Sequence, residues 1–238
     1  MKKRSGFTLA ELVIAVLIFG FMSASLATIY STANRHMFQN YRSNMLKSNV
    51  SMAMIDIRHN LQQATRVDIP AVGAGGNFLA FAVNVDQLTG CYPVNKAATV
   101  TPAWHYFCTA PDAVDPTIIN LYHHTATISG NASWCGSSPS NFWAGADGYL
   151  VPVCGAAIPG QTVTLLMQHS AAPLSPPYSA SMFSRRASAP DNVYERDAVL
   201  VTLRSFWVAS LRGFGTQQRQ RDVDFTLTSL VSITGPKQ

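Results

Sequence analysis

Charged side chains and the sequence motifs of catalysis are both scarce in this chain of 238 residues. Only 12% of its residues are charged, whereas 47% are hydrophobic. We find no H-E-x-x-H, no G-x-S-x-G and no phosphate-binding glycine loop, so no motif predicts a zinc peptidase, a serine hydrolase or a nucleotide-binding enzyme. We therefore expect no enzymatic activity and no cofactor.

Proline is absent before Pro70, and this absence predicts one long N-terminal helix. The residues from Phe7 to about Arg66 are largely good helix formers, with Gly20 as the one weak point. Residues 7–30 are apolar on all sides, and the run Phe7–Met22 alone is almost long enough to cross a bilayer core of about 30 Å. They predict a segment that lies in a membrane or in the core of an assembly.

Residues 31–69 are interpreted as an amphipathic second half of this helix, which ends at Ile69 because the residue before a proline avoids the α region. Polar residues alternate here with an apolar stripe at helical spacing, which we expect to pack against a sheet. The stripe consists of Ala33, Met37, Tyr41, Met45, Met52 and Ile55.

One carboxylate interrupts the apolar half of the helix. Glu11 follows the short basic segment Met1–Gly6 and the residues Phe7–Ala10. An ionised carboxylate in lipid costs on the order of several kcal/mol unless it is paired, so such residues mark functional sites. Glu11 is therefore the leading candidate for a functional residue.

These residues resemble the N-terminal signal of type IV pilins and of the related pseudopilins of secretion systems. The shared features are a leader with positive charges, Gly at its end, then Phe-Thr-Leu, and Glu five residues past the Gly. In this chain they are Lys2, Lys3, Arg4, Gly6, Phe7, Thr8, Leu9 and Glu11. An ordinary signal peptide cleaved near Ser23–Ser25 or Ala27–Thr28 is the alternative, but it gives no reason for Glu11.

The resemblance implies that a prepilin peptidase cuts between Gly6 and Phe7, which removes residues 1–6, and methylates the new amine of Phe7. It also implies that Glu11 pairs with the Phe7 amine of a neighbouring subunit and so sets the register of a filament. Other pilins and an inner-membrane assembly platform are the expected partners. Because positive flanks stay in the cytoplasm, we expect a single pass through the inner membrane, a periplasmic head, and later a pilus or pseudopilus filament.

A looser resemblance lies near the end of the predicted helix. The segment Met54–Ala64 is similar to the "aspartate, aliphatic, arginine" stretch of minor pilins of the PilW kind and of J-type pseudopilins. A solvated helix face explains Asp56 and Arg58 nearly as well.

Residues 70–238 are expected to form an exported, β-rich globular head, which makes the fold class α+β: a long helix on an antiparallel sheet with long disulfide-closed loops. Alternating or β-branched runs predict six strands at Phe78–Val85, His105–Cys108, Thr117–Ile128, Thr162–Gln168, Ala198–Val208 and Val223–Ile233. The last two are predicted to form a closing hairpin around the turn region Gly213–Gln220.

Four cysteines lie in the predicted head: Cys91, Cys108, Cys135 and Cys154. Their even number and exported location predict two disulfides. Three connectivities are open, and we favour Cys91–Cys108 with Cys135–Cys154 because each closes a short loop containing Gly or Pro.

No metal site is predicted from the six histidines. His123 and His124 are neighbours in a predicted strand and must point to opposite faces, and His105 and His169 have no acidic partner close in sequence. Asp112, Asp115 and Asp147 are too sparse for an EF-type calcium loop.

The formal charge of +5 does not predict a nucleic-acid-binding protein, because three of these charges belong to the predicted leader. A solvated turn explains the remaining cluster of Arg212, Arg219 and Arg221 better than DNA capture does.

The sequence therefore favours a minor type IV pilin that primes assembly or sits near the filament tip. A type II secretion pseudopilin is one alternative. A tip adhesin or DNA receptor that binds a ligand through Trp134, Trp143 and the loop around Tyr178 is another. Trp104 and Phe142 are also expected to lie in long loops.

Overall fold

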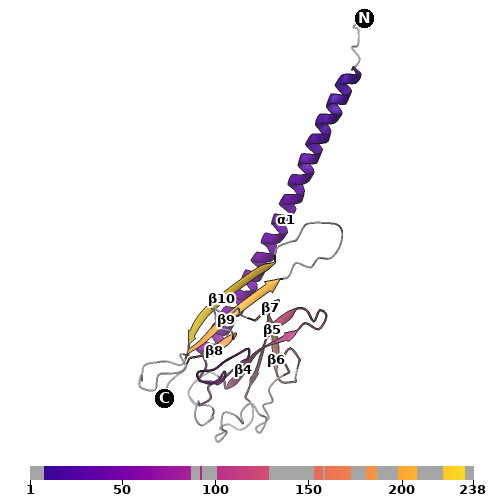
Figure 1. The fold of residues 1–238 in the computed structure, drawn as a ribbon. Helices are drawn as coiled ribbons and strands as arrows, with labels where there is room; N and C mark the ends of the chain where they lie inside the picture. Colours follow the sequence, from indigo (N-terminus) through magenta and orange to yellow (C-terminus); the bar gives the residue numbers. More distant parts are fainter. Residues whose placement is uncertain are drawn as a thin grey trace.

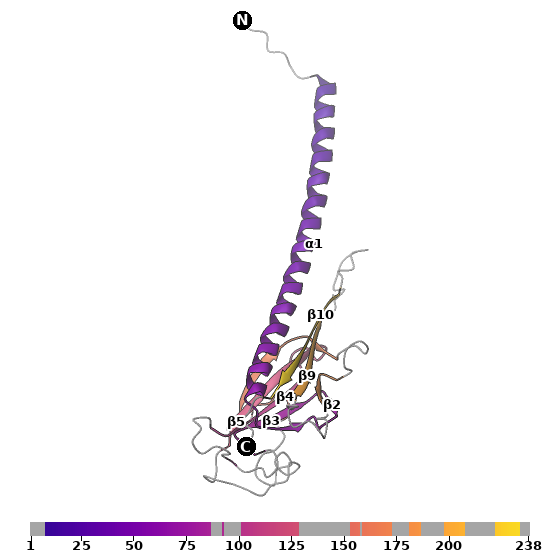
Figure 2. The same ribbon diagram turned by 90° about the vertical axis from the view of Figure 1, so that its left-hand side faces the viewer.

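The computed structural model describes residues 8–86, 92, 101–128, 153–157, 159–172, 181–186, 198–207 and 222–233. In this part of the chain a long helix packs through its C-terminal end against two antiparallel sheets (Figures 1 and 2). Helix α1 spans Leu9–Gln62, which is 54 residues, or about 80 Å at 1.5 Å per residue. This arrangement confirms the predicted α+β, pilin-like fold.

The first sheet, sheet A, has the strand order β1-β3-β4-β5-β6. Its strands are β1 (Arg66–Ile69), β3 (Leu79–Val83), β4 (Ala103–Pro111), β5 (Ile119–Thr127) and β6 (Thr162–Met167). Sheet B has the order β10-β9-β8-β2, and β7 pairs with β9 beside it. Its strands are β2 (Gly75–Gly76), β7 (Ser170–Ala171), β8 (Phe183–Arg185), β9 (Ala198–Trp207) and β10 (Val223–Ser232).

All six predicted strands are present, as β3, β4, β5, β6, β9 and β10. The predicted closing hairpin is confirmed, because β9 and β10 pair without a break from Ala198–Ser232 to Trp207–Val223. The helix ends earlier than predicted, at Gln62, and Arg66–Ile69 forms strand β1 on β3. Thr65 lies just before this strand, and its hydroxyl bonds to Val85. It donates to the Val85 carbonyl at 2.7 Å and accepts from the Val85 N–H at 2.9 Å.

The face of α1 that packs against the sheets is not the predicted one. Its buried residues are Leu46, Val50, Ala53, Met54, Ile57 and Leu61. Met37, Tyr41, Met52 and Ile55 of the predicted stripe are 62–67% exposed. At 100° per residue the two stripes lie on opposite sides of the helix. Both are apolar, so periodicity alone does not identify the buried one.

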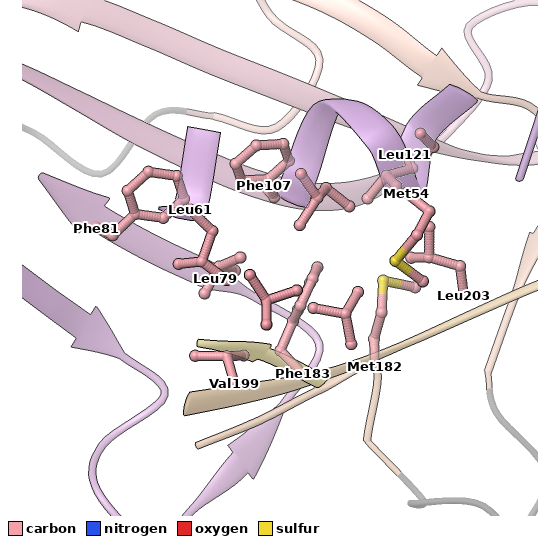
Figure 3. Packing of buried hydrophobic residues seen from close by; sticks show 14 of the residues in the cluster. Met54, Leu61, Leu79, Phe81, Phe107, Leu121, Met182, Phe183, Val199 and Leu203 are labelled. Atoms are coloured by element: carbon pink, nitrogen blue, oxygen red, sulfur yellow. The ribbon is translucent and has the colours of Figure 1, made fainter. Parts of the chain in front are cut away.

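The main core lies between the end of α1, sheet A and sheet B. Figure 3 shows Leu61 of α1 beside Phe81 of sheet A, Met54 beside Met182 and Leu203, and Phe183 of β8 in the same cluster. Side chains alternate along strands, so sheet A also buries residues on its other face. That second cluster includes Ala80, Ala82, Trp104, Tyr106 and Cys108. Sheet A is thus covered on both faces.

Candidate functional site

The start of α1 holds the carboxylate of Glu11 in a capping box with Thr8. One carboxylate oxygen, Oε2, accepts hydrogen bonds from the Thr8 backbone N–H and hydroxyl, both at 2.9 Å. The Thr8 hydroxyl in turn accepts a hydrogen bond from the Glu11 N–H at 3.4 Å. A negative group is also favoured here because the first turn of a helix carries partial positive charge. Glu11 therefore has two donors from its own chain.

The first half of α1 presents an apolar surface that contacts no other element of the described chain. Every residue from 8 to 33 is exposed, and Figures 1 and 2 show this part extending away from the sheets. By length and composition α1 is able to cross a membrane. Three of its hydroxyl groups, including those of Ser25 and Thr32, bond inside the helix: Ser25 donates to the Phe21 carbonyl at 2.9 Å and Thr32 to the Thr28 carbonyl at 2.9 Å. Such internal pairing suits an apolar environment.

C-terminal to this exposed segment, α1 contacts the head. The guanidinium of Arg42 lies over the ring of Trp207, at the end of β9, with 5.3 Å to the ring centroid. Trp207 also stacks on His169, with ring centroids 4.2 Å apart. From Leu46 onward one face of the helix is buried.

The first 27 residues match the family model described as the prokaryotic N-terminal methylation motif. No curated protein and no solved structure gave a significant match to the chain. The chain carries a prepilin-type signal of the type IV pilin and pseudopilin class. Such a signal implies processing by a prepilin peptidase, anchoring through the apolar helix and assembly with other pilins. This match supports a pilin-like or pseudopilin subunit, a class of structural filament proteins.

Five other residues of the prepilin-type signal lie outside the described residues: Lys2, Lys3, Arg4, Gly6 and Phe7. Their assigned roles in orientation, cleavage and methylation stay predictions.

The favoured disulfide pairing of this pilin-like head is wrong. Cys108 is bonded to Cys154, with 5.9 Å between the Cα atoms and a sequence separation of 46. Strand β4 carries Cys108 on the outer face of sheet A, and residues 153–157 cross that face. Gly155 fixes this crossing: its N–H donates to His124 Nε2 at 3.0 Å, and its φ of +77° suits glycine. Cys91 and Cys135 lie outside the described residues.

His124 lies within reach of both Cys108 and Cys154, so these three residues have the composition of a metal site. Because both sulfurs belong to the disulfide, they are not available as thiolate ligands. Burial also lowers the pKa of His124, so the ring stays neutral and accepts from Gly155.

A second histidine cluster was missed by sequence reasoning. His123 points to the inner face of sheet A, opposite to His124 as predicted, and its Nδ1 lies 3.3 Å from Oδ2 of Asp56 on α1. Its Nε2 lies 2.9 Å from Nδ1 of His105. The acidic partner comes from a helix residue far away in sequence, so only the packing of α1 on sheet A brings it close.

The loop acids cap their own turn. Oδ1 of Asp112 accepts from the N–H groups of Val114 at 2.9 Å and Asp115 at 3.1 Å, and Oδ2 accepts from Asn120 at 2.9 Å. These bonds lower the pKa of Asp112. The carboxylate of Asp115 accepts from Thr117. These contacts explain both acids as turn residues, and Asp147 lies outside the described residues.

Trp104 was predicted to lie in a loop, and that prediction is wrong. It lies in β4 and is only 1% exposed, within the second core cluster. The remaining loop aromatics and the arginine cluster considered for DNA capture lie outside the described residues: Trp134, Phe142, Trp143, Tyr178, Arg212, Arg219 and Arg221.

Proposed function

We propose that this protein is a minor type IV pilin, a filament subunit that primes pilus assembly or sits near the tip. The observation that carries the proposal is the exposed first half of α1. Apolar side chains such as Leu9, Phe19 and Phe21 are 73–81% exposed, which is unfavourable in water by about 25 cal/mol per Å². Lipid before assembly and neighbouring helices after assembly would each cover them.

Residue roles follow from the prepilin-type signal and from electrostatics. Lys2, Lys3 and Arg4 hold the leader in the cytoplasm, so the head is placed in the periplasm. Cleavage between Gly6 and Phe7 creates the amine that Glu11 of an adjoining subunit neutralises. In the unassembled subunit Thr8 supports the Glu11 carboxylate, and this local support reduces the cost of holding it at the membrane.

The assignment to a minor pilin rests on the head. Sheet A is covered on both faces, and the segments between strands are long, including residues 128–161 between β5 and β6. Long connecting segments of this kind suit a subunit present in few copies, because they do not have to repeat along the whole filament.

The test is the location and N-terminus of the protein in cells that contain a prepilin peptidase. We expect mass spectrometry to find it in sheared pili, at low copy number relative to the major subunit, with N-methylated Phe7 as its first residue. A terminus beyond Ser23 would show an ordinary signal peptide instead. A correctly processed protein that is absent from sheared pili and is required for protein secretion would be a pseudopilin.

A further inference from the structure

We propose that Asp56, His123 and His105 form an acid-sensitive latch that joins the end of α1 to sheet A. The three side chains form one chain of contacts across the interface, from α1 to β5 to β4. Asp56 Oδ2 lies 3.3 Å from His123 Nδ1, and His123 Nε2 lies 2.9 Å from His105 Nδ1. This inference does not depend on the pilus assignment.

The geometry limits how many protons the histidine pair holds. The facing nitrogens of His123 and His105 are 2.9 Å apart, so one proton fits between them. If both rings were imidazolium, two N–H groups would point at each other. The carboxylate of Asp56 offsets one positive charge but not two. Protonation of both rings therefore breaks the contact between them.

The surroundings of the two rings make protonation of His105 unfavourable. His105 stacks on Phe81 with ring centroids 5.0 Å apart, and His123 stacks on Phe107 at 4.2 Å. Burial, and then the neighbouring His123, lower the pKa of His105 to about 4. Interaction with His123 lowers the pKa of Asp56. At neutral pH the latch thus contains a neutral His105 and an ionised Asp56.

Within the described part of the chain, few other groups act on the latch. His124 on β5 points to the opposite face, and its positive form is disfavoured by burial. On α1, Asn60 supports Asp56, and His59 is exposed. Strands β3 (Leu79–Val83) and β6 (Thr162–Met167) contain no titratable residue, so Phe81 of β3 contributes only an apolar wall.

The sign of the pH effect follows from His105. Its pKa is lower in the folded protein than in the unfolded chain, so its contribution to stability is complete above about pH 6.5 and is lost as the pH falls toward 4. Asp56 loses its contribution at still lower pH, because its pKa is also lowered. Acid therefore weakens the attachment of α1 to sheet A before it affects the acidic partner. The side chain of Asp56 is 38% exposed, which gives protons a way in.

The test uses the full-length protein in detergent micelles. For the wild type we expect the thermal unfolding midpoint to fall from pH 7.5 to pH 4.5, and amide exchange in residues 50–62, corrected for the intrinsic pH dependence, to accelerate more than exchange in β9. His105→Phe keeps the stacking on Phe81 and removes the titrating group, so its midpoint should fall by less than half as much. His59→Gln, which removes an exposed imidazole from the same helix end, should follow the wild type.

An equal acid shift in His105→Phe and the wild type would overturn the latch. NMR titration of the histidine rings in the wild type provides a measurement that needs no variant. We expect the His105 ring to stay neutral down to below pH 5, and protonation of that ring near pH 6.5 would contradict the proposal.

Discussion

The apolar side chains in the two halves of α1 have opposite surroundings. Residues 8–33 are exposed throughout, whereas Leu46, Val50, Ile57 and Leu61 are completely buried against the sheets. The buried half gains its stability from tertiary packing within the chain. The exposed half has no such partner in the described head, so its helix depends on lipid or on other subunits. An apolar sequence therefore does not indicate whether the same chain, lipid or another subunit will bury its side chains.

The carboxylates of the two halves differ in the same way. Glu11 is held by Thr8, three residues away in its own first turn, whereas Asp56 is held by His123 of a strand. A local partner leaves Glu11 free to exchange it for a neighbour's amine. A tertiary partner makes Asp56 part of the fold.

The largest expected effect concerns the disulfide bond. It tests whether the head gains its stability from bonds within the chain. Replacing Cys108 and Cys154 together by serine should lower the free energy of unfolding by about 4 kcal/mol, because the bridge closes a long loop. Denaturant unfolding monitored by tryptophan fluorescence measures this loss. Membrane insertion should be unchanged, since the first half of α1 does not touch the bridge.

Non-reducing peptide mapping checks the pairing itself. It should recover a peptide that joins Cys108 to Cys154, with Cys91 and Cys135 as the remaining pair and no free thiol. A peptide that joins Cys91 to Cys108, or alkylatable thiols in the mature protein, would contradict this connectivity.

A smaller effect separates the two faces of the helix at neighbouring positions of identical chemistry. Ile57 is 0% exposed and Ile55 is 66% exposed. Ile57→Ala should lower the free energy of unfolding by about 3 kcal/mol through the cavity it leaves. Ile55→Ala should change it by less than about 0.5 kcal/mol. Equal losses in denaturant titrations would mean that the buried face of α1 is wrongly assigned.

The same two variants can also be compared by their incorporation into filaments. Ile55→Ala should reduce incorporation into filaments while leaving the isolated subunit stable, if the exposed stripe packs against other subunits. Incorporation of Ile55→Ala at the wild-type level would assign that stripe no role in assembly.

Features set by local sequence were predictable. The lack of proline before Pro70 predicted α1, and alternation predicted the six longer strands. Strands β2, β7 and β8 have only two or three residues each. Such short runs have no periodicity of their own, and they are strands only because longer strands pair with them.

Features set by tertiary packing were not predictable. The end of α1 was placed too late because the segment from Thr65 to Ile69 becomes a strand only when it pairs with β3. The favoured disulfides relied on short loops, but the crossing of residues 153–157 over sheet A brings Cys154 to Cys108. The contact of Asp56 with His123 spans α1 and β5, so no sequence spacing indicated it.

The most direct test of the account is the incorporation of Glu11→Ala into filaments, measured as the amount of variant in sheared pili divided by the amount in the membrane. Insertion and cleavage should persist, because the change makes the helix more apolar and leaves Gly6 and the basic leader intact. Incorporation should fall steeply, because the ammonium of the adjoining subunit would remain unpaired in a low-dielectric core. Glu11→Gln should be nearly as poor, and Thr8→Ala, which removes only the local support, should be less affected. Wild-type incorporation of Glu11→Ala would contradict the account, because the first half of α1 would then assemble without its one carboxylate.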